Sequence, residues 1–230
     1  MKYRNLLFDA DGTLFDFSRS EKNALSETLR HFQIPPSEEI CRTYSEANAE
    51  QWALLEKKQV TRAQLKINRF QNFCQRIGVS KNAAEMAEFY EDSLSRQSFL
   101  IDGAEDICQA LSRVCDLHIV TNGFHRIQTG RFRRSPLLPY FKNVFISEDI
   151  GIEKPDARFF EAAVSAIPDF SKETALIIGD SLSSDMQGGI NFGIDTCWFN
   201  PQRKAPASDM PLTYVIDSLS QLQHIVLRGE

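Results

Sequence analysis

The chain has 230 residues, of which 42% are hydrophobic and 25% charged, which suits one large globular domain or one domain with an insertion. Its formal net charge of -5 argues against a general binder of nucleic-acid polymers or membrane surfaces. No apolar run reaches the roughly 18 residues that a membrane-spanning helix needs, and no signal peptide precedes the first predicted strand.

The first predicted element is a short buried strand over Leu6–Phe8, an apolar run bounded by turn residues. Asp9 and Asp11 follow it, and side chains two residues apart leave an extended chain on the same side. In an open α/β sheet, ligands bind at this carboxyl end of the strands. Two neighbouring carboxylates repel each other, and a divalent cation with oxygen ligands offsets the repulsion. The alternative is that Asp11-Gly12 is an ordinary turn and Asp9 a solvated strand end.

The segment 17–98 is predicted to be helical throughout, because its apolar residues recur at helical spacing and no part of it alternates as a strand does. Ser18 and Glu21 resemble a capping box at the start of its first helix. The helices are expected to begin near Ser18, Ser37, Thr61 and Ser80. We therefore predict a helical insertion over 17–98 within a core formed by 1–16 and 99–230.

Short apolar strands alternate with helices in the rest of the chain. The later strands are expected at 117–120, 144–146, 175–178, 196–199 and 214–216, and helices at 104–111, 157–166 and after Ser218. This alternation predicts a parallel sheet covered on both faces, with right-handed crossovers. The predicted fold class is α/β, with a Rossmann-like parallel sheet and an inserted α-helical domain.

Polar residues also follow the later strands. After the second strand, Thr121-Asn122-Gly123 offers a hydroxyl and backbone N–H groups that can cradle a phosphoryl oxygen. An ordinary strand-to-helix turn is the alternative at this position.

A lysine follows the third strand. Pro155 suits the first position of the next helix, and Lys154 before it would offset negative charge on Asp9 and on a bound phosphoryl group. Most lysines are solvated surface residues, which is the alternative for this one.

Two aspartates follow the fourth strand. Asp180 would be a direct cation ligand, while Asp185 could orient waters on the metal or pair with the lysine. Alternatively, both aspartates cap helices.

Cysteine and histidine usage adds further expectations. The five cysteines are scattered and odd in number, and they form no Cys-x-x-Cys motif, which indicates free thiols in a reducing compartment. A cytoplasmic location is therefore expected. The four histidines have no spacing typical of a zinc site.

The motif Asp9-Ala10-Asp11-Gly12-Thr13 resembles the first motif of the haloacid dehalogenase (HAD) superfamily of aspartate-nucleophile phosphatases. The motifs at Thr121, Lys154 and Asp180 follow in that family's order, and the insertion resembles a C1-type helical cap. The resemblance covers the whole chain and implies the HAD fold.

One branch of the superfamily is especially similar. The stretches 179–191 and 193–201 resemble those of YjjG-type pyrimidine 5'-nucleotidases, as do Thr121–Phe124 with Gln128 and Arg131. That branch hydrolyses nucleoside 5'-monophosphates, preferring pyrimidine and non-standard ones. The resemblance thus implies a small phosphorylated substrate, neither a nucleic-acid polymer nor a membrane as partner, and a monomer or small homo-oligomer.

The resemblance also implies a Mg²⁺-dependent phosphomonoester hydrolase that works through an aspartyl-phosphate on Asp9, with Asp11 as general acid and base. The implied catalytic residues are Asp9, Asp11, Thr121 and Lys154. The implied phosphate-binding residues are Asp9, Thr121, Asn122 and Lys154. The implied Mg²⁺ ligands are the Asp9 carboxylate, the Asp11 backbone carbonyl and the Asp180 carboxylate.

Other functions are consistent with parts of this pattern. A phosphatase or phosphomutase acting on a sugar phosphate or another small organic phosphate is the alternative within the fold. A haloacid dehalogenase is disfavoured because that chemistry does not need the acid/base Asp11. From a different class, a phospho-acceptor signalling module also uses an acidic pocket with a Thr and a Lys, but such modules lack a helical insertion and the Asp-Gly-Thr turn. A binding protein without activity is disfavoured because every expected reactive group is present.

Overall fold

The computed structural model describes residues 2–205 and 210–228, and the chain divides into two compact units. The core unit comprises Met1–Phe17 and Ser98–Glu230, and the helical unit comprises Ser18–Gln97. The helical unit thus lies one residue inside the expected insertion 17–98 at each end. Among the described residues, no helix is long and apolar enough to cross a membrane.

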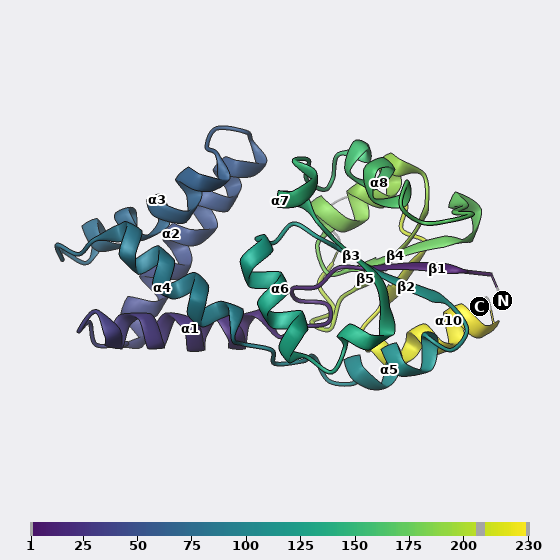
Figure 1. Ribbon diagram of the computed structural model, residues 1–230, viewed down its shortest axis with the longest axis horizontal. Helices are drawn as coiled ribbons and strands as arrows, with labels where there is room; N and C mark the ends of the chain where they lie inside the picture. Colours follow the sequence, from purple (N-terminus) through teal and green to yellow (C-terminus); the bar gives the residue numbers. More distant parts are fainter. Residues whose placement is uncertain (1, 206–209, 229–230) are drawn as a thin grey trace. The chain divides into compact units, whose positions relative to one another are not determined.

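Four helices form the helical unit and its junction with the core unit (Figure 1). They are α1 (Phe17–His31), α2 (Glu38–Glu56), α3 (Arg62–Arg76) and α4 (Ala83–Ser95). Ser37 caps α2, and Thr61 forms a capping box with Gln64 at the start of α3. Helix α4 begins later than predicted, because Asn82, and not Ser80, accepts the free N–H groups of its first turn.

The helical unit has an aromatic core of its own. Tyr44, Phe70, Phe73 and Tyr90 are fully buried. The ring centroids of Tyr44 and Phe70 lie 5.0 Å apart, and those of Tyr44 and Tyr90 lie 5.5 Å apart. These distances are typical of attractive aromatic pairs, so the rings stabilise the packing of α2, α3 and α4.

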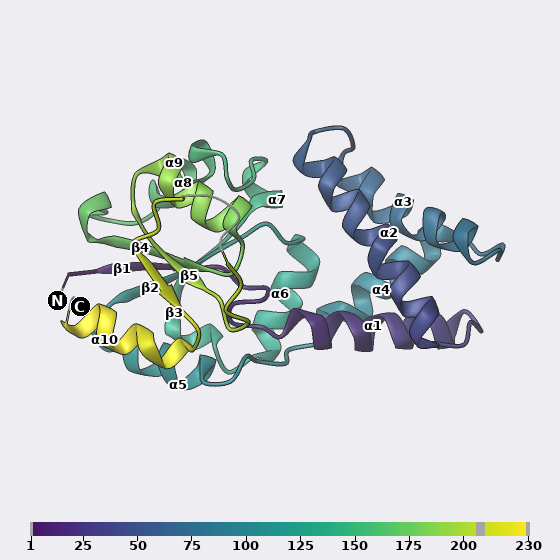
Figure 2. The same cartoon turned by 180° about the vertical axis from the view of Figure 1, so that it is seen from behind.

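The core unit is built on a six-stranded sheet in the order β3-β2-β1-β4-β5-β6 (Figures 1 and 2). The strands are β1 (Asn5–Phe8), β2 (Asp116–Thr121), β3 (Phe141–Ile146), β4 (Ala175–Gly179), β5 (Asp195–Phe199) and β6 (Tyr214–Ile216). Every pairing is parallel. The prediction of an α/β chain with a Rossmann-like parallel sheet is confirmed.

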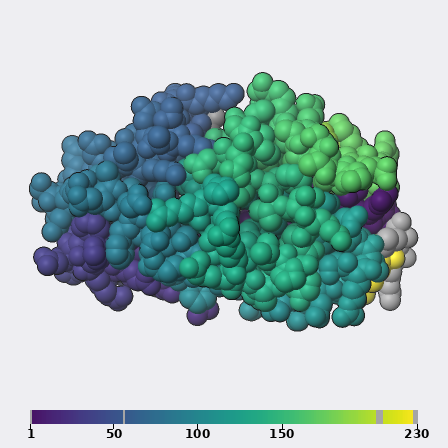
Figure 3. Space-filling view, in the orientation of Figure 1, coloured from purple at the N-terminus to yellow at the C-terminus, as the bar shows by residue number. Residues whose placement is uncertain are grey.

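Helices cover both faces of this sheet: α5 and α10 lie on one face, and α8 and α9 on the other (Figures 1 and 2). The helices of the core unit are α5 (Ala104–Leu111), α6 (His125–Arg134), α7 (Ser147–Ile150), α8 (Ala157–Val164), α9 (Gln187–Phe192) and α10 (Leu222–Arg228). On the face shown in the space-filling view, teal and green residues from the middle of the chain cover most of this unit (Figure 3). The central strand β1 is buried beneath such a surface along its whole length.

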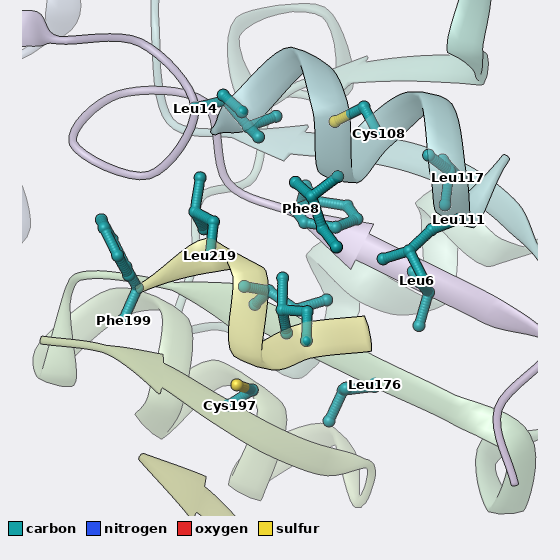
Figure 4. Packing of buried hydrophobic residues seen from close by; sticks show 14 of the residues in the cluster. Leu6, Phe8, Leu14, Cys108, Leu111, Leu117, Leu176, Cys197, Phe199 and Leu219 are labelled. Carbon is teal, nitrogen blue, oxygen red and sulfur yellow. The ribbon is translucent and has the colours of Figure 1, made fainter. Parts of the chain in front are cut away.

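Alternate residues of β1 face the two hydrophobic cores. Leu6 and Phe8 belong to the cluster that includes Leu111 and Leu117 (Figure 4), whereas Leu7 belongs to the cluster on the opposite face. This division follows from the two-residue period of a strand. Burying each such side chain stabilises the fold by about 1.5–3 kcal/mol.

The register of the sheet brings the predicted motifs together at the carboxyl ends of its strands. Phe8 pairs with Ile119 on β2 and with Ile178 on β4, so the residues that follow these three lie side by side. The strand order changes direction about β1, which is the point at which an open α/β sheet binds its ligand. One expectation was wrong: α8 begins after Asp156, whose side chain accepts from the Arg158 N–H, so Pro155 precedes the helix and is not its first residue.

A row of polar side chains crosses the three neighbouring strands β1, β2 and β3. Asn143 donates from Nδ2 to Nδ1 of buried His118 over 3.0 Å, which leaves His118 Nε2–H to donate to Asn5 Oδ1 at 3.3 Å. Burial lowers the pKa of His118 to about 4. The folded protein therefore holds this imidazole neutral.

This histidine should make stability depend on pH. An unfolded histidine titrates near 6.5, so between pH 6.5 and 4 the unfolded chain binds a proton that folded His118 does not. The free energy of unfolding should therefore fall, by up to about 3 kcal/mol, as the pH drops through this range. Urea unfolding at a series of pH values measures this loss. In His118→Gln the total fall between pH 6.5 and 4 should be smaller by that amount, and an equal fall in the two proteins would refute the assignment.

Candidate active site

A buried lysine lies at the centre of the site. Lys154 Nζ donates to Asp9 Oδ1 at 2.7 Å, to Asp185 Oδ1 at 2.6 Å and to the Val120 carbonyl at 2.6 Å. Only 1% of the lysine side chain is exposed. All three hydrogens of the ammonium group are thus used, and the surface-lysine alternative is wrong.

Burial by itself would lower the pKa of Lys154, but Asp185 and Asp9 outweigh this effect and raise it. The lysine is therefore a fixed cation. Asp185 accepts from Lys154 through one oxygen and from the Ser181 N–H, at 3.0 Å, through the other. Of the two roles considered for Asp185, the structure shows pairing with the lysine.

Three carboxylates converge at this edge. Asp9, Asp180 and Asp185 each offer an oxygen, and these oxygens all lie within 4.8 Å of one another. Glycine makes the approach possible on one side: a Cβ at Gly12 would stand 2.5 Å from Asp180 Oδ2, and its φ of +84° suits glycine. A Cβ at Gly179 would stand 2.3 Å from the Asp185 carboxylate.

Among the described residues, the negative charges of this cluster outnumber the positive ones. Burial raises the pKa of Asp9, with Lys154 opposing this effect and the charges of Asp185 and Asp180 adding to it. Asp180 is exposed at the surface, yet partial desolvation of its carboxylate and the charge of Asp185 raise its pKa to about 7. Three carboxylates face one ammonium group, and a hard divalent cation bound by oxygen atoms would supply the missing charge. The donor set therefore fits Mg²⁺.

The backbone and side chain of Asp180 are held from two directions. Trp198 Nε1 donates to the Asp180 carbonyl at 2.9 Å, and Thr13 Oγ1 donates to Asp180 Oδ1 at 3.4 Å. The threonine of the first motif and an indole on β5 thus position the aspartate that follows β4.

Asp11 lies next to α6. Gln128 Nε2 donates to its Oδ2 at 2.6 Å, and Arg131 Nη1 forms an ion pair with its Oδ1. The Arg131 side chain is fully buried, whereas 27% of the Asp11 side chain is exposed. The sequence analysis identified Gln128 and Arg131 only as part of a resemblance to one branch of the family. It did not predict their contacts with Asp11.

Thr121 and Asn122 follow β2, as predicted. Thr121 Oγ1 accepts from the Gly123 N–H at 3.1 Å and from Gln128 Nε2 at 3.3 Å, so its own hydrogen can still be donated to a ligand. The Asn122 side chain accepts from the Lys154 N–H and donates to the Lys154 carbonyl, each over 2.9 Å. These hydrogen bonds of the Asn122 side chain to the Lys154 backbone were also not predicted, because no local sequence pattern indicates a contact between distant loops.

The structure thus brings Asp9, Lys154, Asp180 and Asp185 together, with Thr121 linked to Asp11 through Gln128. Carboxylates, a fixed ammonium group and a free hydroxyl donor at one sheet edge can bind a phosphoryl group and a divalent cation. One of the carboxylates would then be available as a nucleophile.

Comparison with known proteins agrees with this geometry. The family model described as "haloacid dehalogenase-like hydrolase" matches residues 3–193. The chain is 40% identical to pyrimidine 5'-nucleotidase PynA of Streptococcus pneumoniae over 223 residues, covering 96% of this chain and 94% of PynA. It is 28% identical to pyrimidine 5'-nucleotidase YjjG of Escherichia coli over 228 residues, covering 99% and 100% of the two chains.

A third relative has a solved structure. The chain is 39% identical over 225 residues to HAD-hydrolase YfnB of Bacillus subtilis, covering 98% of this chain and 96% of YfnB. A crystal structure of YfnB bound to magnesium matches with a TM-score of 0.94 at 38% identity, over 99% of this chain and 100% of that one. The resemblance predicted from the sequence motifs is confirmed.

Proposed function

The chain belongs to the haloacid dehalogenase-like hydrolase family, and from this premise we propose that it is a Mg²⁺-dependent phosphatase acting through an aspartyl-phosphate on Asp9. One observation carries the proposal: buried Lys154 joins Asp9 to Asp185, and the Asp9 and Asp180 oxygens are close enough to share one cation.

The proposed reaction begins at Asp9. A carboxylate oxygen attacks phosphorus, the bond between phosphorus and the ester oxygen breaks, and Asp11 gives a proton to the departing alcohol. Water then attacks the aspartyl-phosphate while Asp11 takes its proton. The bond between phosphorus and Asp9 breaks, so inorganic phosphate leaves and both aspartates return to their starting states.

The remaining residues would interact with the charged phosphoryl group and with the cation. The Thr121 hydroxyl and the Asn122 backbone N–H would donate to the phosphoryl oxygens. The Lys154 ammonium group, whose three hydrogens are taken by protein acceptors, would offset the charge of those oxygens from beside Asp9. The Asp9 and Asp180 carboxylates with the Asp11 backbone carbonyl would hold Mg²⁺, which supplies positive charge beside the transferred group when bound. The segment 17–98 would act as the cap domain that selects the leaving group.

The proposed substrates are nucleoside 5'-monophosphates, with pyrimidine or non-standard bases preferred. Two relatives named pyrimidine 5'-nucleotidase, which match over nearly the whole chain, support this choice. A panel of phosphomonoesters tests it: UMP and dUMP should be hydrolysed with higher kcat/KM than sugar phosphates. If a sugar phosphate is instead turned over far faster, the nucleotidase assignment fails and the phosphatase assignment stands.

Removal of Mg²⁺ should abolish activity. EDTA is expected to reduce hydrolysis of UMP to background, and added Mg²⁺ to restore it. Binding should also be visible without turnover, because Mg²⁺ at 100 times its Kd would stabilise the folded protein by about 2.7 kcal/mol. We expect a rise in Tm with Mg²⁺ that is lost in Asp180→Asn. Asp169→Asn is the matched control, since Asp169 is exposed and its φ of 52° also suits asparagine. An undiminished rise in Asp180→Asn would contradict the proposed metal site.

A further inference from the structure

Two side chains of α6 contact the carboxylate of Asp11, one on each oxygen. Gln128 Nε2 donates to Oδ2, and Arg131 Nη1 pairs with Oδ1. The two residues are three positions apart, so they lie on the same face of the helix. Both are fully buried, which is unusual for such polar side chains. Burying such polar side chains costs free energy of folding, which indicates that Gln128 and Arg131 have a specific role.

Arg131 also contacts the segment that follows Asp11. Its guanidinium lies 4.4 Å from the centre of the Phe15 ring. Asp11 and Phe15 are themselves joined by a bridge, and the Gly12 N–H donates to the Phe15 carbonyl at 2.9 Å. The arginine is thus held between the carboxylate and an aromatic face of one tight loop, which restricts where the carboxylate can point.

Gln128 links the Asp11 carboxylate to the Thr121-Asn122-Gly123 motif. Its Nε2 also donates to Thr121 Oγ1 at 3.3 Å. Gly123 makes this reach possible, because a Cβ at that position would stand 2.3 Å from Gln128 Nε2. The glycine of the Thr-Asn-Gly motif is therefore required by the glutamine and not only by a turn.

From these contacts we infer that Gln128 and Arg131 are positioning residues for proton transfer by Asp11. The inference rests on the proposed function, in which Asp11 gives a proton to the departing alcohol oxygen as the bond from that oxygen to phosphorus breaks. Together the two side chains fix the direction in which the Asp11 carboxyl group points.

The test compares substrates that differ in their need for this proton. A nucleoside 5'-monophosphate releases a primary alcohol and needs the proton, whereas p-nitrophenyl phosphate releases a phenolate that is stable without it. The measured quantity is kcat/KM, because it reports the steps up to departure of the leaving group and excludes hydrolysis of the aspartyl-phosphate.

In Arg131→Met, we expect kcat/KM to fall about 10- to 100-fold for UMP and less than about 3-fold for p-nitrophenyl phosphate. Arg133→Met is the matched control, because Arg133 is an exposed arginine of the same helix, and it should change neither value. Gln128→Met provides a second variant should Arg131→Met fail to fold, and Arg131→Lys, which keeps the positive charge, should recover part of the loss for UMP.

Equal losses for the two substrates, or no loss for either, would overturn the inference. A defect of folding or of phosphate binding would lower both values together, so the ratio separates positioning from a general structural role. The parent protein separates this inference from the proposed function: if it hydrolyses neither phosphomonoester with Mg²⁺ present, the proposed function fails before any variant is compared.

Discussion

Replacement of Asp9 by asparagine is expected to reduce phosphomonoester hydrolysis by at least about 10⁴-fold, as removal of a catalytic nucleophile does in other enzymes. The amide has nearly the same shape as the carboxylate but cannot attack phosphorus. The variant should stay folded, because Lys154 keeps Asp185 and the Val120 carbonyl as partners. Hydrolysis of p-nitrophenyl phosphate at saturating Mg²⁺ measures the effect with high sensitivity.

The control for Asp9→Asn is Asp169→Asn, which changes an exposed carboxylate to an amide and should retain full activity. Activity of Asp9→Asn within about 10³-fold of the parent would show that another group is the nucleophile, since the loss of one electrostatic contact costs about 10²- to 10³-fold.

The second large effect is expected at Lys154. In Lys154→Met, kcat/KM should fall about 10²- to 10³-fold, because a fixed cation beside the phosphoryl group is lost. Stability should fall as well. Removing one partner of a buried ion pair costs about 3–5 kcal/mol, since it leaves the other partner buried without compensation. Here Asp9 and Asp185 would both lose their partner.

Mg²⁺ should restore part of this lost stability, because a cation between Asp9 and Asp180 again offsets the buried negative charge. Urea unfolding of parent and variant with and without Mg²⁺ measures both effects. Lys142→Met, at an exposed position of β3, is the matched control and should change the free energy of unfolding by less than about 0.5 kcal/mol. A Lys154→Met protein as stable as the parent without Mg²⁺ would contradict the described charge balance.

Local patterns were sufficient to predict the sheet and the acidic edge. Leu6–Phe8 is apolar and short, and the residues after it are turn formers, so the strand and the place of Asp9 follow from periodicity. The alternation of later strands with helices predicted a parallel sheet, and parallel strands bring their carboxyl ends to one edge. The convergence of Asp9 and Asp180 follows from this topology.

Contacts between distant loops could not be predicted in the same way. Helix α6 carries few strongly apolar residues besides Ile127 and Phe132, so its pattern does not stand out, and the link from Gln128 to Asp11 depends on how the helix packs. The hydrogen bonds of Asn122 to the Lys154 backbone join two loops that meet only in the folded sheet. In each case the polar residue types suggested chemistry, while the partner was set by tertiary structure.

The central claim is that acids after β1 and β4 share one cation and that the acid after β1 receives the phosphoryl group. Rapid quenching of the Mg²⁺-loaded enzyme during turnover of a ³²P-labelled phosphomonoester tests it most directly. In a parallel quenched sample, borohydride converts the phosphorylated aspartate to homoserine with release of phosphate, and peptide mapping of the homoserine identifies the side chain that carried the label. We predict acid-stable label on Asp9 that disappears when the reaction is chased, and no label in Asp9→Asn. Label on another residue, or turnover by the parent with no labelled protein at any quench time, would contradict the account.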